Sequence, residues 1–207
     1  MAINSLSTGF RPGVCTSSTR PTAPYEGQFI YETDTDMLAI WNGTAWRYIA
    51  STTATNGTVL QIQSTIKTDT FSMTSTTFAD VTGLSVSITP KSTTSKIFVM
   101  AAVSGTGQLA ATNFFGRLMR DSTAIAVADA ASSRTQSTIA ARDQDNGSVM
   151  PVMFLDSPAT VSAVTYKIQV RSQGSGSAVY INRTGPDSDS ATTARTVSSI
   201  TVFEVSA

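Results

Sequence analysis

Hydrophobic and polar residues alternate with a period of two in several segments of the chain. Successive side chains of a β-strand point to opposite faces of the sheet, so this pattern predicts strands with one buried and one solvated face. The clearest examples are residues 84–89 and 164–171, together with the spacing of Leu60, Ile62 and Ile66. The pattern therefore predicts a β domain that begins close to residue 59.

Two segments, 97–103 and 149–155, are almost continuously apolar instead of alternating. A continuous apolar strand is typical of a sheet that is covered on both faces. Large exposed apolar patches are rare on monomers, so we expect a neighbouring subunit to supply the second cover within a closed assembly. The subunit interface is predicted to contain Ile97, Phe98, Val99, Met100, Met153 and Phe154.

Composition supports an all-β fold. Val and Ile together outnumber Leu by 29 to 7, and Ser and Thr make up 61 of the 207 residues. β-branched residues favour strands, whereas Glu and Lys, which favour helices, are scarce. About ten strands separated by short turns predict an antiparallel β-sandwich or jelly roll. The Ala-rich stretch 123–142 is compatible with either a short helix or a long loop.

The chain is predicted to have four parts. Residues 1–27 form an extended arm, because Pro12, Pro21 and Pro24 prevent a regular helix. Residues 28–50 form a small three-stranded meander, whose last turn carries the two-residue hairpin signal Asn42-Gly43. Residues 51–58 are a polar linker, and residues 59–207 are the main β domain.

The arm contains apolar residues but too few to form a core. It therefore either docks onto another protein or is a disordered terminus. The docking interpretation assigns the contacts to Ile3, Leu6, Phe10, Arg11, Pro12 and Arg20. A meander of about 22 residues is marginal alone, so its aromatic residues are expected to form either a small core or a partner contact: Tyr31, Trp41, Trp46 and Tyr48.

The charged and reactive residues exclude several classes of function. The 14 basic and 14 acidic residues cancel, which disfavours nucleic acid as a partner. The absence of His removes Ser-His-Asp and Cys-His catalysis and His-ligated metals. Cys15 is alone, has no base beside it in the sequence, and is interpreted as an unreactive thiol. No cofactor is expected.

Two acidic segments, 143–147 and 186–189, superficially match calcium loops. An EF-hand that began at Asp143 would need Glu at its twelfth position, where the chain has Phe154. We therefore interpret both segments as turns and expect no metal site. No stretch of 18 apolar residues predicts a membrane span. The first ten residues lack a signal-peptide pattern, which predicts that the chain is made and assembled in a cytoplasm.

Three N-terminal segments together resemble a module that recurs in tailed-bacteriophage virion proteins: the run from Arg11 to Pro21, the run from Pro24 to Thr35, and the run from Trp41 to Trp46. Residues 78–90, 95–99, 166–170 and 180–183 are similar to C-terminal domains of phage and cyanophage structural proteins. The order of elements also resembles trimeric jelly rolls of the tumour-necrosis-factor and complement-globular-head type. The resemblance implies a virion component that forms a homotrimer.

The leading hypothesis is a non-enzymatic phage structural protein: a tail fibre, a head fibre or a capsid decoration protein. It would dock through its arm to a capsid, tail or baseplate protein and present its β domain to a host polysaccharide or receptor. Candidate receptor-contacting residues lie in four predicted loops: Gln108, Asn113, Asp143, Asn146, Gln173, Asp187 and Asp189. The alternatives are a polysaccharide-degrading spike enzyme, disfavoured by the few carboxylates, and a carbohydrate-binding module.

Overall fold

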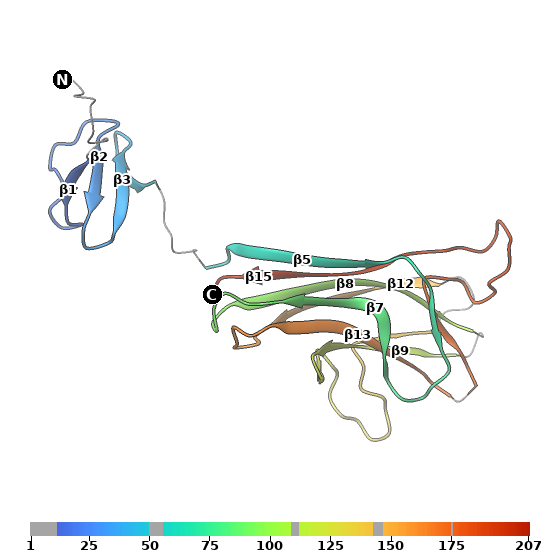
Figure 1. Cartoon of the computed structure of the whole chain (residues 1–207). Helices are drawn as coiled ribbons and strands as arrows, with labels where there is room; N and C mark the ends of the chain where they lie inside the picture. Colours follow the sequence, from blue (N-terminus) through green and yellow to red (C-terminus); the bar gives the residue numbers. More distant parts are fainter. Residues whose placement is uncertain (1–11, 50–55, 109–111, 143–146, 175) are drawn as a thin grey trace. The chain divides into compact units, whose positions relative to one another are not determined.

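The computed structural model describes residues 12–49, 56–108, 112–142, 147–174 and 176–207. The chain divides into two compact units, Met1–Ala54 and Thr55–Ala207, which are described separately (Figure 1). Both units are all-β, and the described residues contain no helix. The predicted all-β class is therefore confirmed, and the stretch 123–142 forms two short strands joined by a loop.

The N-terminal unit is a four-stranded sheet in the order β1-β2-β3-β4. Its strands are β1 (Gly13–Cys15), β2 (Phe29–Glu32), β3 (Met37–Trp41) and β4 (Trp46–Tyr48). The three strands of the predicted meander are present, but the β3–β4 turn differs from the expected two-residue turn. Trp41 pairs with Trp46, which leaves a four-residue loop. The Asn42 side chain accepts hydrogen bonds from the N–H groups of Thr44 and Ala45 and so stabilises this longer loop.

The predicted arm needs a correction, because part of it belongs to this sheet. Strand β1 pairs with β2 in parallel, with Gly13 opposite Ile30 and Cys15 opposite Glu32. The segment between them supplies the connection that a parallel pair requires. Residues 1–11 lie outside the described residues.

The C-terminal unit is a sandwich of two sheets. The β8 sheet has six strands: five follow the order β5-β15-β8-β14-β6, and β12 pairs with the other edge of β8. Its strands are β5 (Val59–Lys67), β6 (Phe71–Met73), β8 (Lys96–Gly107), β12 (Ser148–Asp156), β14 (Val179–Ile181) and β15 (Ser198–Val205). The β13 sheet has the order β10-β9-β13-β7, and β11 also pairs with β9. Its strands are β7 (Ala79–Ile88), β9 (Phe114–Arg120), β10 (Thr123–Ile125), β11 (Ile139–Ala141) and β13 (Val164–Ser172).

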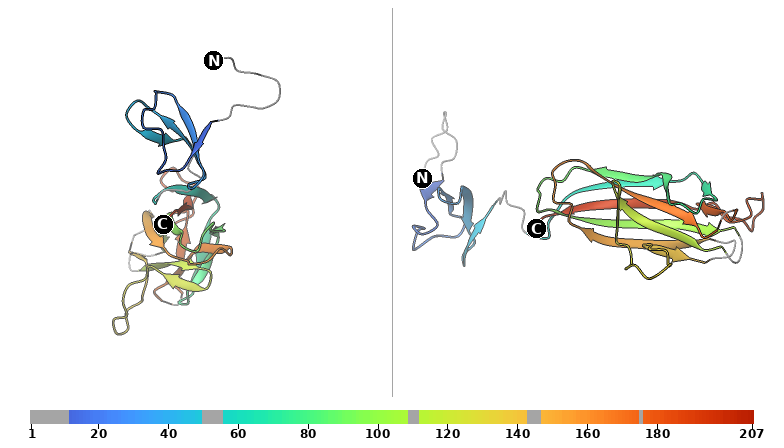
Figure 2. Two further views of the ribbon diagram at one scale, coloured as in Figure 1. Left: turned by 90° about the vertical axis from the view of Figure 1, so that its left-hand side faces the viewer. Right: turned by 90° about the horizontal axis from the view of Figure 1, so that it is seen from below.

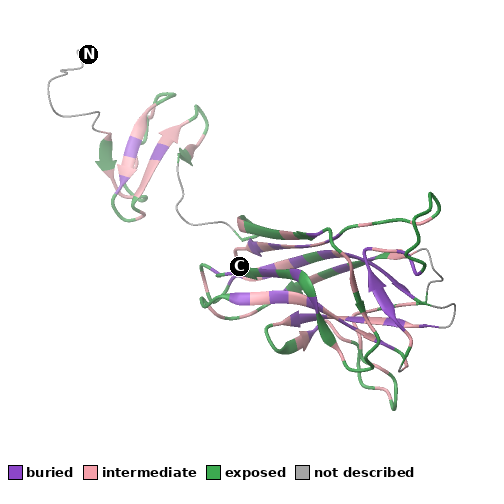
Figure 3. Cartoon of the chain, turned by 45° about the vertical axis from the view of Figure 1, so that its right-hand side comes forward, coloured by how far each residue is buried: buried purple, intermediate pink, exposed green. Residues whose placement is uncertain are grey.

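One continuous hydrophobic core lies between these two sheets. The alternation read from the sequence faces it as predicted, since Leu84, Val86 and Ile88 are buried. Figure 3 shows the same alternation of buried and exposed positions along the other long strands. Phe114 reaches the core where β8 has glycine: a Cβ at Gly105 would lie 2.9 Å from the Phe114 ring. This glycine therefore makes room for the largest apolar ring of the core.

The two ends of the sandwich differ in which parts of the chain lie there. At one end the chain enters next to its own C-terminus, because Gly57 donates to the Ser206 carbonyl and Ser206 donates to the Thr58 carbonyl. Strand β8 starts at this end, where Lys96 pairs with Val205, and it finishes at the other end with Gly107. We call the end at Gly107 the distal end of the sandwich; Figure 2 shows the long strands running between the two ends.

Candidate functional site

The described residues at the ends of the four predicted loops gather at the distal end. The Gln108 N–H donates to the Ala178 carbonyl at 2.8 Å, and the Asn113 N–H donates to Gln173 Oε1 at 3.1 Å. Gly105 pairs with Ser148 on one side and with Ile181 on the other. Segments from four separate parts of the chain therefore meet on one surface, which we call the distal surface.

A polar hollow opens in the 182–197 segment of the distal surface. Its volume is about 350 Å³, and its lining is Asp187, Ser188, Asp189, Ser190, Thr193, Ala194 and Arg195. Asp187 forms ion pairs with Arg195 at 2.6 Å and with Arg183 at 3.3 Å. The Arg183 guanidinium also lies 4.1 Å from the centre of the Tyr180 ring. These contacts hold the hollow on the β14 strand that supports it.

The predicted receptor-contacting residues therefore have two kinds of environment. Gln108 and Gln173 brace neighbouring loops, since the Ala178 N–H donates to Gln108 Oε1 and the Asn113 N–H to Gln173 Oε1. Asp187 is held by its two arginines, whereas Asp189 is exposed in the hollow. Asp143 and Asn146 lie outside the described residues. Carboxylates, hydroxyls and a guanidinium offer acceptors and donors to a hydroxyl-rich ligand.

The outer faces of the two sheets differ in their chemistry. The outer face of the β13 sheet is polar: Lys167 binds Asp80 at 2.7 Å, and the Arg117 guanidinium donates to Gln169. The outer face of the β8 sheet exposes large apolar side chains, with Met153 66% and Leu155 55% exposed. The polar face satisfies its charges within one chain, whereas the apolar face is left uncovered by it.

Three of the six predicted interface residues lie in or against the core of the sandwich, and three lie on the outer face of the β8 sheet. Ile97 and Val99 point into the chain's own core, and Phe154 packs against that core. The other three, Phe98, Met100 and Met153, lie on the outer face. One chain thus covers one face of the two apolar strands β8 and β12, not both.

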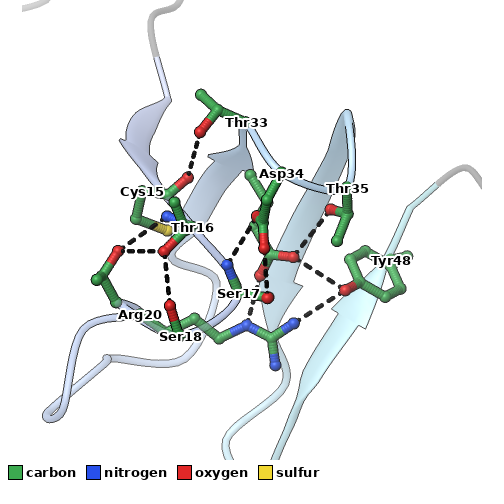
Figure 4. Close-up of polar contacts among 11 residues, drawn as sticks. Cys15, Thr16, Ser17, Ser18, Arg20, Thr33, Asp34, Thr35 and Tyr48 are labelled. Carbon is green, nitrogen blue, oxygen red and sulfur yellow. Dashed lines mark hydrogen bonds and ion pairs between the residues drawn. The ribbon is translucent and has the colours of Figure 1, made fainter.

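The N-terminal unit contains a buried carboxylate. Glu32 has no exposed surface, and it accepts hydrogen bonds from Arg20 Nε, the Tyr48 hydroxyl at 2.9 Å and the Thr35 hydroxyl at 3.0 Å. Figure 4 labels these three partners, Arg20, Thr35 and Tyr48. The hydrogen bond from Arg20 is the main reason that the pKa of Glu32 lies below its ordinary value. The pair connects the β1–β2 segment to β2 and β4.

Among the residues predicted to dock, Arg20 is therefore committed to an internal ion pair. Pro12 directly precedes β1, and Ile3, Leu6, Phe10 and Arg11 lie outside the described residues. The four aromatic residues of the meander do not form its core: Tyr48 is 40% exposed, and the buried apolar side chains are Ile30 and Ala39. Trp41 and Trp46 contact each other edge to face, 5.5 Å apart.

Two polar clusters inside the molecule were not found from the sequence. In the sandwich, Asp156 accepts hydrogen bonds from Arg120 at 2.9 Å and from the buried Tyr166 hydroxyl at 2.7 Å. Burial is the main cause that raises the pKa of Tyr166. In the N-terminal unit the missed residue is Glu32. The sequence pattern places Glu32 in a strand, one residue after Tyr31, but nothing near it in the sequence indicates that it is buried and paired with Arg20.

No group of three or more His, Cys, Asp or Glu residues suited to a metal ion occurs within the described ranges. Those ranges also hold no helix that could cross a membrane. Cys15 is half-buried, and burial, followed by the nearby Glu32 charge, raises the pKa of its thiol. A raised pKa keeps the thiol protonated and poorly nucleophilic at neutral pH.

No known family model matches the chain, and no curated protein matches it. Among the solved structures that are similar to it are two of viral particles. One is the crystal structure of the infectious bursal disease virus VP2 subviral particle, with 10% identity, a TM-score of 0.36, and coverage of 90% of this chain and 50% of that chain. The other is the structure of T=1 particles derived from infectious bursal virus, with 11% identity, a TM-score of 0.35, and coverage of 90% and 48%. The chain spans about half the length of these proteins.

Proposed function

We propose that this chain is a non-enzymatic structural component of a tailed-bacteriophage virion that presents a β-sandwich to the host surface. The observation that carries the proposal is the polarity of the sandwich: the chain enters at one end, and four loops gather at the other. An entry end that connects to an attachment unit, and a far end built from loops, is an arrangement suited to display. Loops on a rigid β scaffold commonly carry recognition.

The attachment role belongs to the N-terminal unit. The segments that resemble phage virion modules, from Gly13 to Trp46, fold as one small sheet. Its described residues bury only Ile30 and Ala39 as apolar core. Units of about 40 residues usually need a further source of stability. Docking onto a capsid, tail or baseplate protein would supply it, and the corrected attachment element is the whole sheet rather than an arm of 27 residues.

The assembled form in this proposal is a homotrimer on the virion. At the distal surface the ligand is a host-surface polysaccharide or glycosylated receptor, because the hollow around Asp189 is lined with hydroxyl, carboxylate and guanidinium groups. A free carbohydrate-binding module is the second candidate function, and the same hollow favours it. The two candidates differ in whether the N-terminal unit binds a virion protein.

Deletion of residues 1–54 tests the attachment role. The remaining sandwich has its own core and should stay folded, but it should be lost from purified particles, as measured by immunoblotting. Incorporation of the truncated chain at normal copy number would contradict the proposal. Loss of the chain together with unchanged glycan binding by the free sandwich would confirm that attachment and recognition are separate.

Asp189→Ala tests the display role. Host-cell adsorption of particles should fall several-fold while the copy number of the chain stays unchanged. Asp129→Ala is the matched control, because it removes an exposed carboxylate from the loop between β10 and β11, away from the hollow. Normal adsorption of the Asp189 variant would contradict recognition through the hollow.

A further inference from the structure

The outer face of the β8 sheet is organised in three rows that cross four strands. The paired registers place the strands in the order β12, β8, β15 and β5. Across them, the rows are Leu155, Phe98, Phe203 and Ile62; Met153, Met100, Thr201 and Ser64; and Pro151, Ala102, Ser199 and Ile66. We call these twelve residues the row surface.

The row surface contains no charged side chain. Its large members are exposed to an extent that is unusual for a sheet with polar surroundings: Ile66 and Met153 are each 66% exposed, Leu155 is 55% and Ile62 is 54% exposed. On the opposite sheet, the corresponding outer positions of β13 include Lys167, Gln169 and Arg171. The difference shows that exposure at the row surface is not the general character of this sandwich.

The surface is also shaped. Small residues at its centre, Ala102, Ser199 and Thr201, form the floor of a groove of about 270 Å³. Larger side chains border it, among them Met100, Met153 and Phe203. The row surface therefore carries both a groove and projecting Met and Phe side chains, so the projecting side chains of one copy can fill the groove of another.

The row surface is large enough to form the apolar centre of a protein interface. It spans five residues on each of four strands, which at about 3.3 Å per residue and about 4.8 Å between strands gives roughly 300 Å² of flat area. Side chains that project from it increase the accessible area. A standard interface buries about 800 Å² on each partner and has an apolar centre with a polar rim, so the row surface would supply the centre.

We infer that the row surface binds the row surfaces of other copies of this chain. A surface without charge meets its own copy without burying an unmatched charge, which would otherwise oppose association. Pro151 in the edge strand β12 lacks an N–H donor, and proline on an edge discourages strand addition. Copies therefore associate through this face of the sheet rather than by adding strands at its edge. This inference deepens the proposed homotrimer and rests on it.

Sedimentation of the full chain at micromolar concentration tests the inference. The wild-type chain should sediment as an oligomer. Met153→Glu and Ile66→Glu, on strands at opposite sides of the row surface, should each weaken association about a hundredfold or more, because each buries a charge. Val161→Glu and Ser85→Glu place the same charge at exposed positions outside the row surface and should leave the oligomer unchanged. Far-ultraviolet circular dichroism should show that all variants are folded.

A cross-linking measurement keeps the test independent of these substitutions. Thr201→Cys in a Cys15→Ser background places one thiol at the centre of the row surface, and a short bis-maleimide should link copies through it. Ser85→Cys in the same background is the control and should link few. A monomeric wild-type chain would overturn both the inference and the homotrimer. An oligomer that neither Glu variant weakens would overturn the inference alone, and neither result bears on virion attachment through residues 1–54.

Discussion

The interiors of the two units differ in what holds them together. The sandwich encloses a continuous apolar cluster that includes Leu118, Tyr166 and Ile168, all fully buried. The described part of the N-terminal unit buries Ile30 and Ala39, and beside them the charged Glu32. Apolar burial is non-directional and insensitive to pH, whereas a buried ion pair depends on both partners and on their protonation. The sandwich also buries the carboxylates of Asp156 and Glu204, but beside a much larger apolar cluster. Loss of a buried ion pair should therefore cost the smaller unit a larger share of its stability.

Both tryptophans of the chain, Trp41 and Trp46, lie in the N-terminal unit. Tryptophan fluorescence thus reports unfolding of that unit alone, while far-ultraviolet circular dichroism is dominated by the larger sandwich. The difference between the units can be measured on the intact chain.

Phe114→Ala should have the largest effect. The ring is fully buried and lies against Gly105 and Gly116, so its loss leaves a cavity in the sandwich core and should cost about 3–5 kcal/mol of unfolding free energy. Urea unfolding followed by circular dichroism measures this loss. Phe115→Ala, one residue away on the outer face, should cost far less, and equal losses would show that Phe114 does not anchor the core.

Arg20→Ala should destabilise the N-terminal unit by about 2–4 kcal/mol, because it leaves the Glu32 carboxylate buried without its cation. The fluorescence transition in urea should shift to lower concentration, or disappear if the unit unfolds. The circular-dichroism transition of the sandwich should not move. Arg47→Ala, on β4 and exposed, is the matched control. If neither change shifts the fluorescence transition, the Arg20–Glu32 ion pair does not stabilise the unit.

Low pH should lower the stability of the N-terminal unit by a smaller amount than Arg20→Ala does. The pKa of Glu32 is lower in the folded unit than its ordinary value of 4.5, so its contribution is complete above about pH 4.5 and is lost as the pH falls through the folded pKa. The urea concentration at the midpoint of the fluorescence transition should fall as the pH is lowered through this range. Glu32→Gln should be less stable at neutral pH and should show a flatter pH profile; an unchanged slope in this variant would assign the acid effect to other carboxylates.

Lys167→Ala should have the smallest effect. Lys167 and Asp80 form an ion pair on the solvated face of the β13 sheet, and such pairs contribute about 1 kcal/mol or less. Urea unfolding should shift only slightly, and salt should reduce the difference from wild type. A loss of unfolding free energy comparable with that of Phe114→Ala would contradict the assignment of this ion pair to a solvent-exposed face.

The strands that alternate strictly could be predicted from the sequence, because one buried face imposes a period of two. Thus Leu84, Val86 and Ile88 were placed correctly in the core. The pairing of β1 could not be predicted, because Gly13–Cys15 is too short to show a period and its partner Phe29–Glu32 is parallel and distant along the chain. The apolar runs were assigned to strands correctly, but a pattern in one chain cannot distinguish a face covered by the same chain from an exposed one.

The polar interior contacts were missed for a related reason. Glu32 and Asp156 carry no local signal of burial, since their partners Arg20, Tyr48, Arg120 and Tyr166 come from other segments. The loops of the distal surface were found because turn residues are recognisable locally. That Gln108 and Gln173 brace the loops depends on three-dimensional contacts.

Association through the uncharged row surface, as proposed above, would make assembly sensitive to temperature and to the rate of synthesis. Association of apolar faces has a negative heat-capacity change and weakens on cooling. It is also bimolecular, so newly folded monomers wait longer for a partner when few copies have been made. During that time the bare face is open to aggregation or to chaperones. Yield should therefore be greatest when the chain is made rapidly and warm, and lowest when it is made slowly in the cold.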